Sequence, residues 1–312
     1  MNRAELSFAT PRKLPKPASV RGRVVVLDLA FASEASGGGF AKITKPFIDG
    51  LGSRLAAWVD HHDHALHAQY KDDPRFVLAT KAQHGACPEM VTPELCQRVG
   101  AVDTIVCHTD FDGLCSAAKW MREGVEPYPG SDDDARAIDT RIGKPSPRAQ
   151  RFDRAIRARP RDPALLGLIV RHLANGLADE SLWHDVDAAG AELEAVEKVT
   201  SELARGYRRL DVPKPTHPSC TSIAFLDVTD KKNGKRYDKT MLLLLGQERA
   251  SIALLVDQDT LTLAAPFDSG LNFLGLLGLS GGMPTLVSVG ADRLSEALGL
   301  LGVSRSDADA LR

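Results

Sequence analysis

Three short runs of apolar residues in the N-terminal third of the chain each end in an acid or a histidine. The runs cover residues 23–28, 55–59 and 102–107. They do not alternate with polar residues, which is typical of strands buried on both faces. Residues 46–51 and 114–123 have the pattern of helices. Strands that alternate with helices predict an α/β domain built on a parallel sheet.

The C-terminal half has a different pattern. We expect a helix over residues 163–175, capped by Asp162, and one long helix over residues 185–210 that stops at a proline-rich segment. The later elements are strands over residues 222–228, 241–245, 251–256, 260–265 and 285–289, a helix or loop over 271–279 and a helix over 294–301. The predicted division is an N-terminal arm (1–20), an α/β domain of catalytic type (21–184), a linker helix (185–212) and a smaller α/β domain (213–312).

Composition narrows the class of protein. The 312 residues are 43% hydrophobic and 26% charged with a formal charge of −2, which is typical of a globular protein rather than a basic nucleic-acid coat. Aromatic residues make up only 5%, too few for a row of base-stacking side chains. The five cysteines include no C-x-x-C pair, so neither a disulfide framework nor a thiolate zinc site is expected. No apolar segment is long enough to span a membrane and the N-terminus lacks a signal-peptide core, so we expect a soluble, cytoplasmic protein.

Acids and histidines gather directly after the three predicted strands. The first strand ends at Asp28, the second runs into Asp60-His61-His62, and the third runs into His108-Thr109-Asp110-Phe111-Asp112-Gly113. The carboxyl ends of parallel strands meet at one edge of a sheet, so these side chains should lie close together. Clustered carboxylates repel one another, and a pair of divalent ions bound by carboxylates and imidazoles removes that conflict. Each feature alone is also typical of a turn or a helix cap; their coincidence at three strand ends predicts a metal site.

These motifs resemble those of the DHH phosphoesterase superfamily. The run Asp60-His61-His62 is similar to the motif that names the superfamily, and residues 108–118 are similar to its first motif, a D-x-D-G followed by small residues at a helix start. Residues 85–90 are similar to the stretch that trails the DHH run in relatives. The second domain resembles the DHH-associated substrate domain, with residues 278–285 at its glycine-rich loop. The resemblance covers most of residues 21–302.

The resemblance implies a hydrolase that acts on phosphoester bonds with two manganese ions, magnesium being the alternative ion. The metal ligands that it implies are Asp28 as the bridge between the ions, His61, His108, Asp110, Asp112 and Asp139. For Asp139 the alternative is a loop or cap residue. Two further residues have implied catalytic roles: Asp60 orients an imidazole and His62 faces the substrate phosphate. The implied substrate-binding residues are Ser280, Gly281 and Gly282.

Two features depart from the superfamily's pattern. The D-x-D-G motif follows the DHH run instead of preceding it, which indicates a permuted sheet, and the glycine loop ends in Met283-Pro284-Thr285 where relatives carry a histidine. Two functions therefore stay open. One is manganese-dependent hydrolysis of a nucleotide, a cyclic dinucleotide or a short oligonucleotide in the cleft between the domains. The other is a nucleotide-binding or scaffold protein of the same fold that has lost catalysis.

The expected partner is accordingly a phosphorylated small molecule or a short oligonucleotide, with no membrane and no long nucleic acid; the oligomeric state stays open. Between residues 141 and 161 there are eight basic residues and one acidic residue. Such a segment is typical either of a landing surface for a polyanion or of a solvated helix face.

Overall fold

The structure is a computed structural model that describes residues 4–33 and 38–304. It divides into two compact units, unit 1 (Met1–Leu193) and unit 2 (Glu194–Arg312). Each unit contains its own sheet and its own covering helices, so the two are described in turn.

Unit 1 is built on a five-stranded sheet in which every neighbouring pair of strands is parallel. In chain order its strands are β1 (Glu5–Ala9), β2 (Val24–Leu27), β3 (Leu55–Asp60), β5 (Phe76–Leu78) and β6 (Thr104–His108). Their spatial order is β1-β6-β2-β3-β5. The predicted parallel sheet is therefore confirmed. The order reverses at β2, which has β3 on one side and β6 on the other, and ligands bind open α/β sheets at such a switch point.

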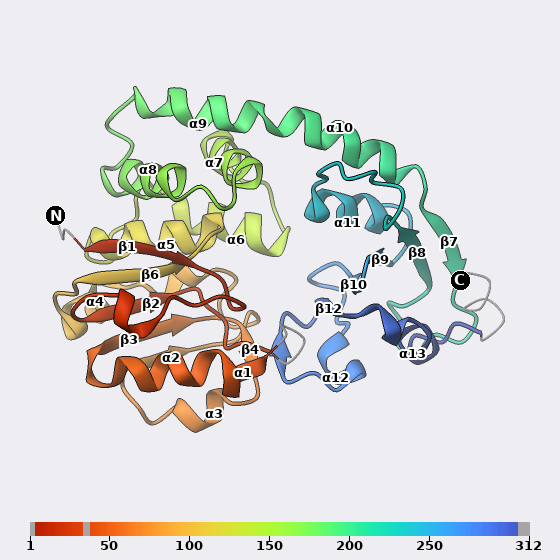
Figure 1. The fold of residues 1–312 in the computed structure, drawn as a ribbon, viewed down its shortest axis with the longest axis horizontal. Coiled ribbons are helices and arrows are strands. Elements are labelled where there is room, and N and C mark those ends of the chain that lie inside the picture. Colours follow the sequence, from red (N-terminus) through yellow and green to blue (C-terminus); the bar gives the residue numbers. More distant parts are fainter. Residues whose placement is uncertain (1–3, 34–37, 305–312) are drawn as a thin grey trace. The chain divides into compact units, whose positions relative to one another are not determined.

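Helices cover both faces of this sheet, as Figure 1 shows for α2 on one side and α5 and α8 on the other. The helices of unit 1 are α1 (Gly39–Lys42), α2 (Thr44–Leu51), α3 (His67–Tyr70), α4 (Pro93–Val99), α5 (Phe111–Met121), α6 (Ser131–Thr140), α7 (Pro147–Ala158), α8 (Pro163–Ala174) and α9 (Leu182–Ala191). Successive residues of β2 pack into different core clusters, Val24 and Val26 against α2 and Val25 and Leu27 against α5. Burial on both faces explains why the strands read as continuous apolar runs.

The predicted N-terminal arm is corrected by the structure. Glu5–Ala9 form strand β1, which pairs in parallel with β6 at the edge of the sheet. Leu6 and Phe8 pack against the core, while Glu5 and Ser7 alternate with them. That short alternation is the strand signal, and the charges and prolines around it obscured it.

The predicted single helix over residues 185–210 is also corrected. The chain forms α9 and then α10 (Leu193–Ala204), which together make a long bent helix linking the two units. α10 ends at Ala204, and Arg208–Asp211 form strand β7. Gly206 weakens the helix at this point, and pairing with β8 (Ser222–Asp227) fixes the residues after it as a strand.

The basic segment of residues 141–161 contains all of α7, and two of its arginines hold this part of the chain against α9 and the residue after it. Arg151 binds both carboxylate oxygens of Asp187 at 2.7 and 2.6 Å and lies over the ring of Trp183. Arg159 pairs with Glu192. These two of the eight basic residues are thus paired within unit 1, and both interpretations of the segment stay predictions.

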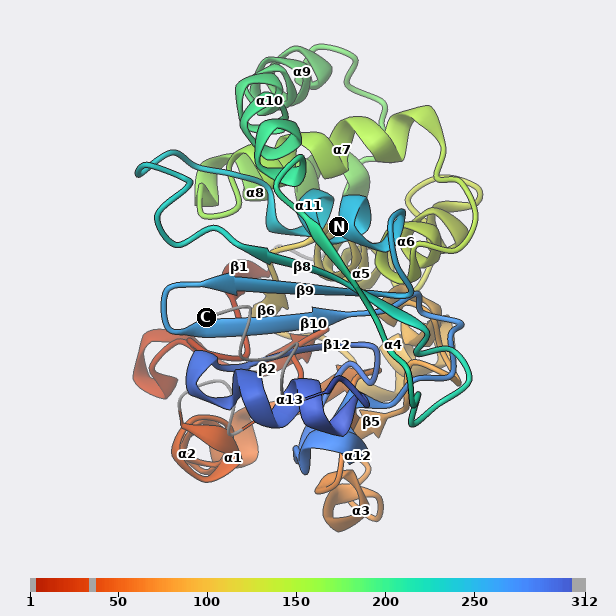
Figure 2. The same ribbon diagram turned by 90° about the vertical axis from the view of Figure 1, so that its right-hand side faces the viewer.

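Unit 2 has a mixed sheet in the order β12-β10-β9-β8-β7. Its other strands are β9 (Ile252–Asp257), β10 (Thr260–Ala264) and β12 (Leu286–Gly290), and its helices are α11 (Lys239–Gln247), α12 (Phe273–Leu277) and α13 (Leu294–Leu300). The pair β8–β9 is parallel and the other pairs are antiparallel. Figure 2 shows α11 on one side of this sheet and α13 on the other.

One predicted strand of unit 2 is wrong. Residues 241–245 lie in helix α11, which Asp238 caps by accepting a hydrogen bond from the Met241 amide at 2.9 Å. Leu242 and Leu243 are buried against the sheet. A short apolar run does not distinguish a strand from a buried helix, and the cap is the signal that decides it. No helix among the described residues is long and apolar enough to cross a membrane.

Replacing Ser7 with proline tests the edge strand. The Glu5 amide donates to the Asp103 carbonyl at 2.8 Å, so the alternation of a parallel ladder points the Ser7 amide at β6 as well. Proline removes that donor, and we expect Ser7→Pro to lower the free energy of unfolding of unit 1 by about 1–3 kcal/mol. Ser7→Thr keeps the amide and should change it by less than about 0.5 kcal/mol.

Tryptophan fluorescence is the appropriate measurement, because Trp58, Trp120 and Trp183 all belong to unit 1 and are the only tryptophans of the chain. Equal denaturation midpoints for the proline and threonine variants would show that β1 contributes nothing to stability.

Candidate metal centre

The register of the sheet brings three strand ends to the same level. Leu27 of β2 pairs with Val59 of β3 and with Cys107 of β6. The next residue in each strand is therefore level with the others: these are Asp28, Asp60 and His108. Asp28 has a φ of 57°, in the left-handed region that aspartate tolerates, and its amide donates to the Val59 carbonyl at 2.9 Å. The chain thus turns sharply after β2, and the Asp28 carboxylate lies at the point where the strand order of the sheet reverses.

The imidazole of His61 is the centre of the cluster. Its Nε2 lies 3.2 Å from Asp28 Oδ1, 3.1 Å from Asp112 Oδ2 and 3.8 Å from Asp139 Oδ2. Asp28, His61 and Asp112 are almost completely buried. Residues from three strand ends and from α6 therefore meet within a few ångströms, and the predicted proximity of Asp28, His61 and Asp112 is confirmed.

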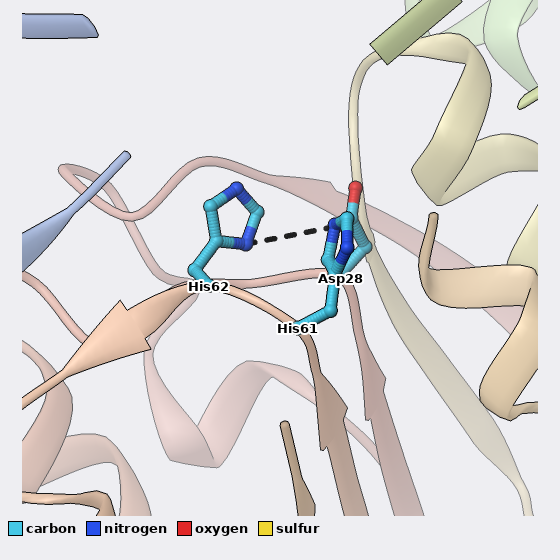
Figure 3. Close-up of side chains that lie close together, drawn as sticks. All are labelled: Asp28, His61 and His62. Atoms are coloured by element: carbon cyan, nitrogen blue, oxygen red, sulfur yellow. Dashed lines mark ion pairs between the residues drawn. The ribbon is translucent and has the colours of Figure 1, made fainter. Parts of the chain in front are cut away.

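The neighbouring histidines extend the cluster on both sides. His62 Nδ1 lies 3.8 Å from Asp28 Oδ1, the ion pair drawn in Figure 3, and donates to Asp60 Oδ1 at 2.8 Å. His108 Nδ1 lies 3.6 Å from Asp28 Oδ2 and 2.7 Å from Asp110 Oδ2. Asp60 thus orients His62, and Asp28 faces a histidine on each side.

Three sets of side chains have ligand atoms close enough together to hold a metal ion. The sets are Asp28/His61/His62, Asp28/His108/Asp110 and His61/Asp112/Asp139, each with its ligand atoms within 4.8 Å of one another. All seven residues were nominated from the sequence, six as metal ligands and His62 as a substrate contact. Asp28 belongs to two of the sets, and so does His61. The individual roles assigned to these residues stay predictions.

Buried polar atoms provide an independent test of whether a metal ion fits. Among the described residues, both carboxylate oxygens of Asp28, Asp60 Oδ2 and His61 Nε2 are buried and make no hydrogen bond, although Asp28 and His61 lie within ion-pair distance of each other. Buried polar atoms without partners are costly, and divalent ions use these oxygen and imidazole ligands. The donor set therefore fits divalent metal ions.

The tautomer of His61 suits metal binding. Its Nδ1 lies 2.9 Å from the His84 carbonyl oxygen, which can only accept, so Nδ1 carries a proton. In the neutral imidazole the lone pair is then on Nε2, the nitrogen that faces Asp28 and Asp112. A carbonyl that orients a metal-binding histidine in this way is a common second ligand-sphere contact.

Crowding of the acids changes their protonation. Burial, together with the negative charge of Asp28, raises the pKa of Asp112 well above its usual range. Burial alone would lower the pKa of His61, but the Asp112 and Asp28 carboxylates raise it to about 11. The cluster thus attracts positive charge strongly, whether a proton or a metal ion supplies it.

Sequence reasoning missed three groups that support this cluster. They come from the segment between β5 and α4: the buried amine of Lys81, which contacts the Asp139 carboxylate, the His84 carbonyl, and the Cys87 amide, which donates to Asp112 Oδ1 at 2.9 Å. A lone lysine and two backbone groups leave no pattern in a sequence. The similarity of residues 85–90 to a DHH relative was the only available signal, and it assigned no role.

The predicted substrate-binding residues belong to unit 2. Gly281 and Gly282 form the short extended segment β11, and Ser280 before them is exposed. Gly282 has a φ of 131°, a backbone angle that residues other than glycine rarely adopt. The substrate contacts of this loop stay a prediction.

Comparison with known proteins adds no assignment. The sequence matches no protein-family model, and no curated protein is significantly similar to it. The class that the fold and the site define is therefore an α/β protein with a buried Asp/His centre able to hold metal ions.

Manganese should stabilise unit 1 through this centre. At 100 times the dissociation constant, a bound ion adds about 2.7 kcal/mol to the free energy of unfolding. We expect Asp28→Asn, which alters two of the three sets, to lose most of this gain. Asp72→Asn makes the same change at an exposed position outside the sets and should keep the gain.

Thermal unfolding followed by tryptophan emission, with manganese and with EDTA, measures both effects. A wild-type melting temperature that does not respond to manganese would contradict the metal centre.

Proposed function

We propose that the protein is a manganese-dependent phosphoesterase that hydrolyses a nucleotide, a cyclic dinucleotide or a short oligonucleotide. The observation that carries the proposal is the pair of sets Asp28/His108/Asp110 and His61/Asp112/Asp139, with Asp28 next to both. Two adjacent sets of carboxylates and imidazoles are typical of two-metal hydrolases. The resemblance of the same residues to the DHH motifs supports phosphorus as the centre attacked.

The metal ions, when bound, supply an activated water molecule and positive charge for the phosphate oxygens. The chain supplies the geometry. Asp28, Asp110 and Asp112 would hold the ions, and the His84 carbonyl orients His61 so that its Nε2 would face them. Because register and buried hydrogen bonds fix these groups, little reorganisation is needed when a substrate binds.

His62 is the residue we propose to touch the substrate phosphate. Its side chain is 19% exposed, whereas those of His61 and Asp60 are fully buried. The bond from its Nδ1 to Asp60 leaves Nε2 free to face a ligand. An imidazole held by a carboxylate in this way can stabilise negative charge or donate a proton to a leaving group.

The alternative, a binding or scaffold protein that has lost catalysis, rests on the missing histidine of the glycine loop, where the chain has Met283-Pro284-Thr285. Both metal sets, in contrast, retain all the ligands that the resemblance implies, including Asp139. Complete ligand sets favour the enzyme.

Asp112→Asn tests the proposal. Losing one negatively charged ligand should weaken one ion and reduce turnover at least about 100-fold, roughly 2.7 kcal/mol of activation free energy. Folding should persist, because the change removes one acid from a repelling cluster. The measurement is phosphate or nucleotide release from a panel of mononucleotides, cyclic dinucleotides and short oligonucleotides, with manganese, magnesium or EDTA.

Asp72→Asn is again the control and should keep wild-type turnover. Manganese binding without hydrolysis of any substrate in the panel would favour the binding or scaffold protein. Equal turnover for the Asp112→Asn variant and the wild type would remove Asp112 from the site.

A further inference from the structure

A buried lysine lies beside the metal centre. Lys81 is only 3% exposed, and its amine contacts Oδ2 of Asp139. Buried lysines are rare unless they are paired. The turn that carries Lys81 is fixed by hydrogen bonds, since the His84 and Gln83 amides both donate to the Thr80 carbonyl. The same turn presents the His84 carbonyl to His61, so the amine and the carbonyl are held against the centre together.

The amine of Lys81 contacts an oxygen atom that is also a candidate metal ligand. Asp139 Oδ2 is also the oxygen that lies 3.8 Å from His61 Nε2. The ammonium group therefore neutralises a carboxylate of the set His61/Asp112/Asp139. In the part of the chain that the structure describes, no lysine or arginine forms an ion pair with the set Asp28/His108/Asp110. Lys81 thus contacts a carboxylate of one set directly and interacts with Asp28 of the other set only through its charge.

We propose that Lys81 is a positioning residue that weakens binding of the ion at His61/Asp112/Asp139, so that the two ions bind in order. An ion entering this set competes with the ammonium group for Asp139 and is repelled by its charge. The set Asp28/His108/Asp110 lacks that competitor and fills first. The set His61/Asp112/Asp139 binds its ion more weakly, so the fraction of it that is occupied rises with the free metal concentration. This inference rests on the metal centre and does not require the proposed hydrolysis.

Manganese titration of EDTA-treated protein, with free manganese measured by electron paramagnetic resonance, tests the proposal. For the wild type we expect two dissociation constants. Lys81→Gln removes the charge and should tighten the weaker site by at least about 10-fold. The stronger site, which has no ion pair with Lys81 but whose Asp28 also interacts with its charge, should tighten by clearly less than the weaker site. Lys81→Arg keeps the charge and should keep the weak site weak.

The chain offers a matched control for losing a buried lysine. Lys119 is also buried and ion-paired, to Asp132 at 2.5 Å, but it contacts none of the three metal sets. Lys119→Gln should leave both dissociation constants unchanged. Asp139→Asn should abolish the weaker site and spare the stronger one, which identifies the weaker site as His61/Asp112/Asp139.

A second measurement covers the case in which Lys81→Gln does not fold without metal. Protein prepared in manganese and mixed with excess chelator should release its weaker ion at least about 10-fold more slowly in this variant than in the wild type. A weaker site that is unchanged in both measurements overturns the proposal. So does equal weakening of both sites, which is what a purely structural role of Lys81 predicts. Because hydrolysis is not measured, a protein that binds ions and hydrolyses nothing gives the same result.

Discussion

The repulsion among buried carboxylates at one edge of the sheet is the constraint on which the centre depends. Asp28, Asp112 and His61 are buried together because the register of β2, β3 and β6 aligns the ends of these strands. Such a cluster persists only if positive charge compensates it. The chain supplies part of that charge through His61 and Lys81. Both Asp28 oxygens still make no hydrogen bond, so the cluster has the charge and the ligand atoms to hold a metal ion.

The parts of the fold that the sequence predicts well are those in which local pattern and tertiary environment agree. Strands β2, β3 and β6 are buried on both faces, so their apolar runs are unambiguous. The hydrophobic pattern does not predict the element where a helix and a strand would bury the same apolar residues equally well. The leucines of α11 would suit a strand as well as a helix, and only the cap at Asp238 distinguishes them. Gly206 is the one sequence signal that separates β7 from the helix before it, and pairing with β8 makes the residues after it a strand.

The candidate site follows the same rule. Asp28, His61 and Asp112 could be predicted because each follows a recognisable strand, and parallel strands share one edge. Asp139 comes from α6, and only the resemblance to a family pointed to it. Lys81 and the His84 carbonyl come from a turn whose position depends on the packing of the segment between β5 and α4. No local feature of the sequence predicts where this turn lies relative to the centre.

Register, and not the order of motifs along the chain, sets the geometry of this centre. Leu27 is paired with Val59 on one side and Cys107 on the other, so β2 would bring Asp28 to the same atoms whichever neighbour came first in the sequence. A permuted chain can therefore keep a metal site as long as each strand ends level with its neighbours. What permutation changes is the connections, and the turn that holds Lys81 belongs to one of them. Register fixes Asp28 and aligns the strand ends that His61 and Asp112 follow, whereas a connection fixes Lys81, so a substitution in that connection changes the charge beside the centre and leaves these three side chains in place.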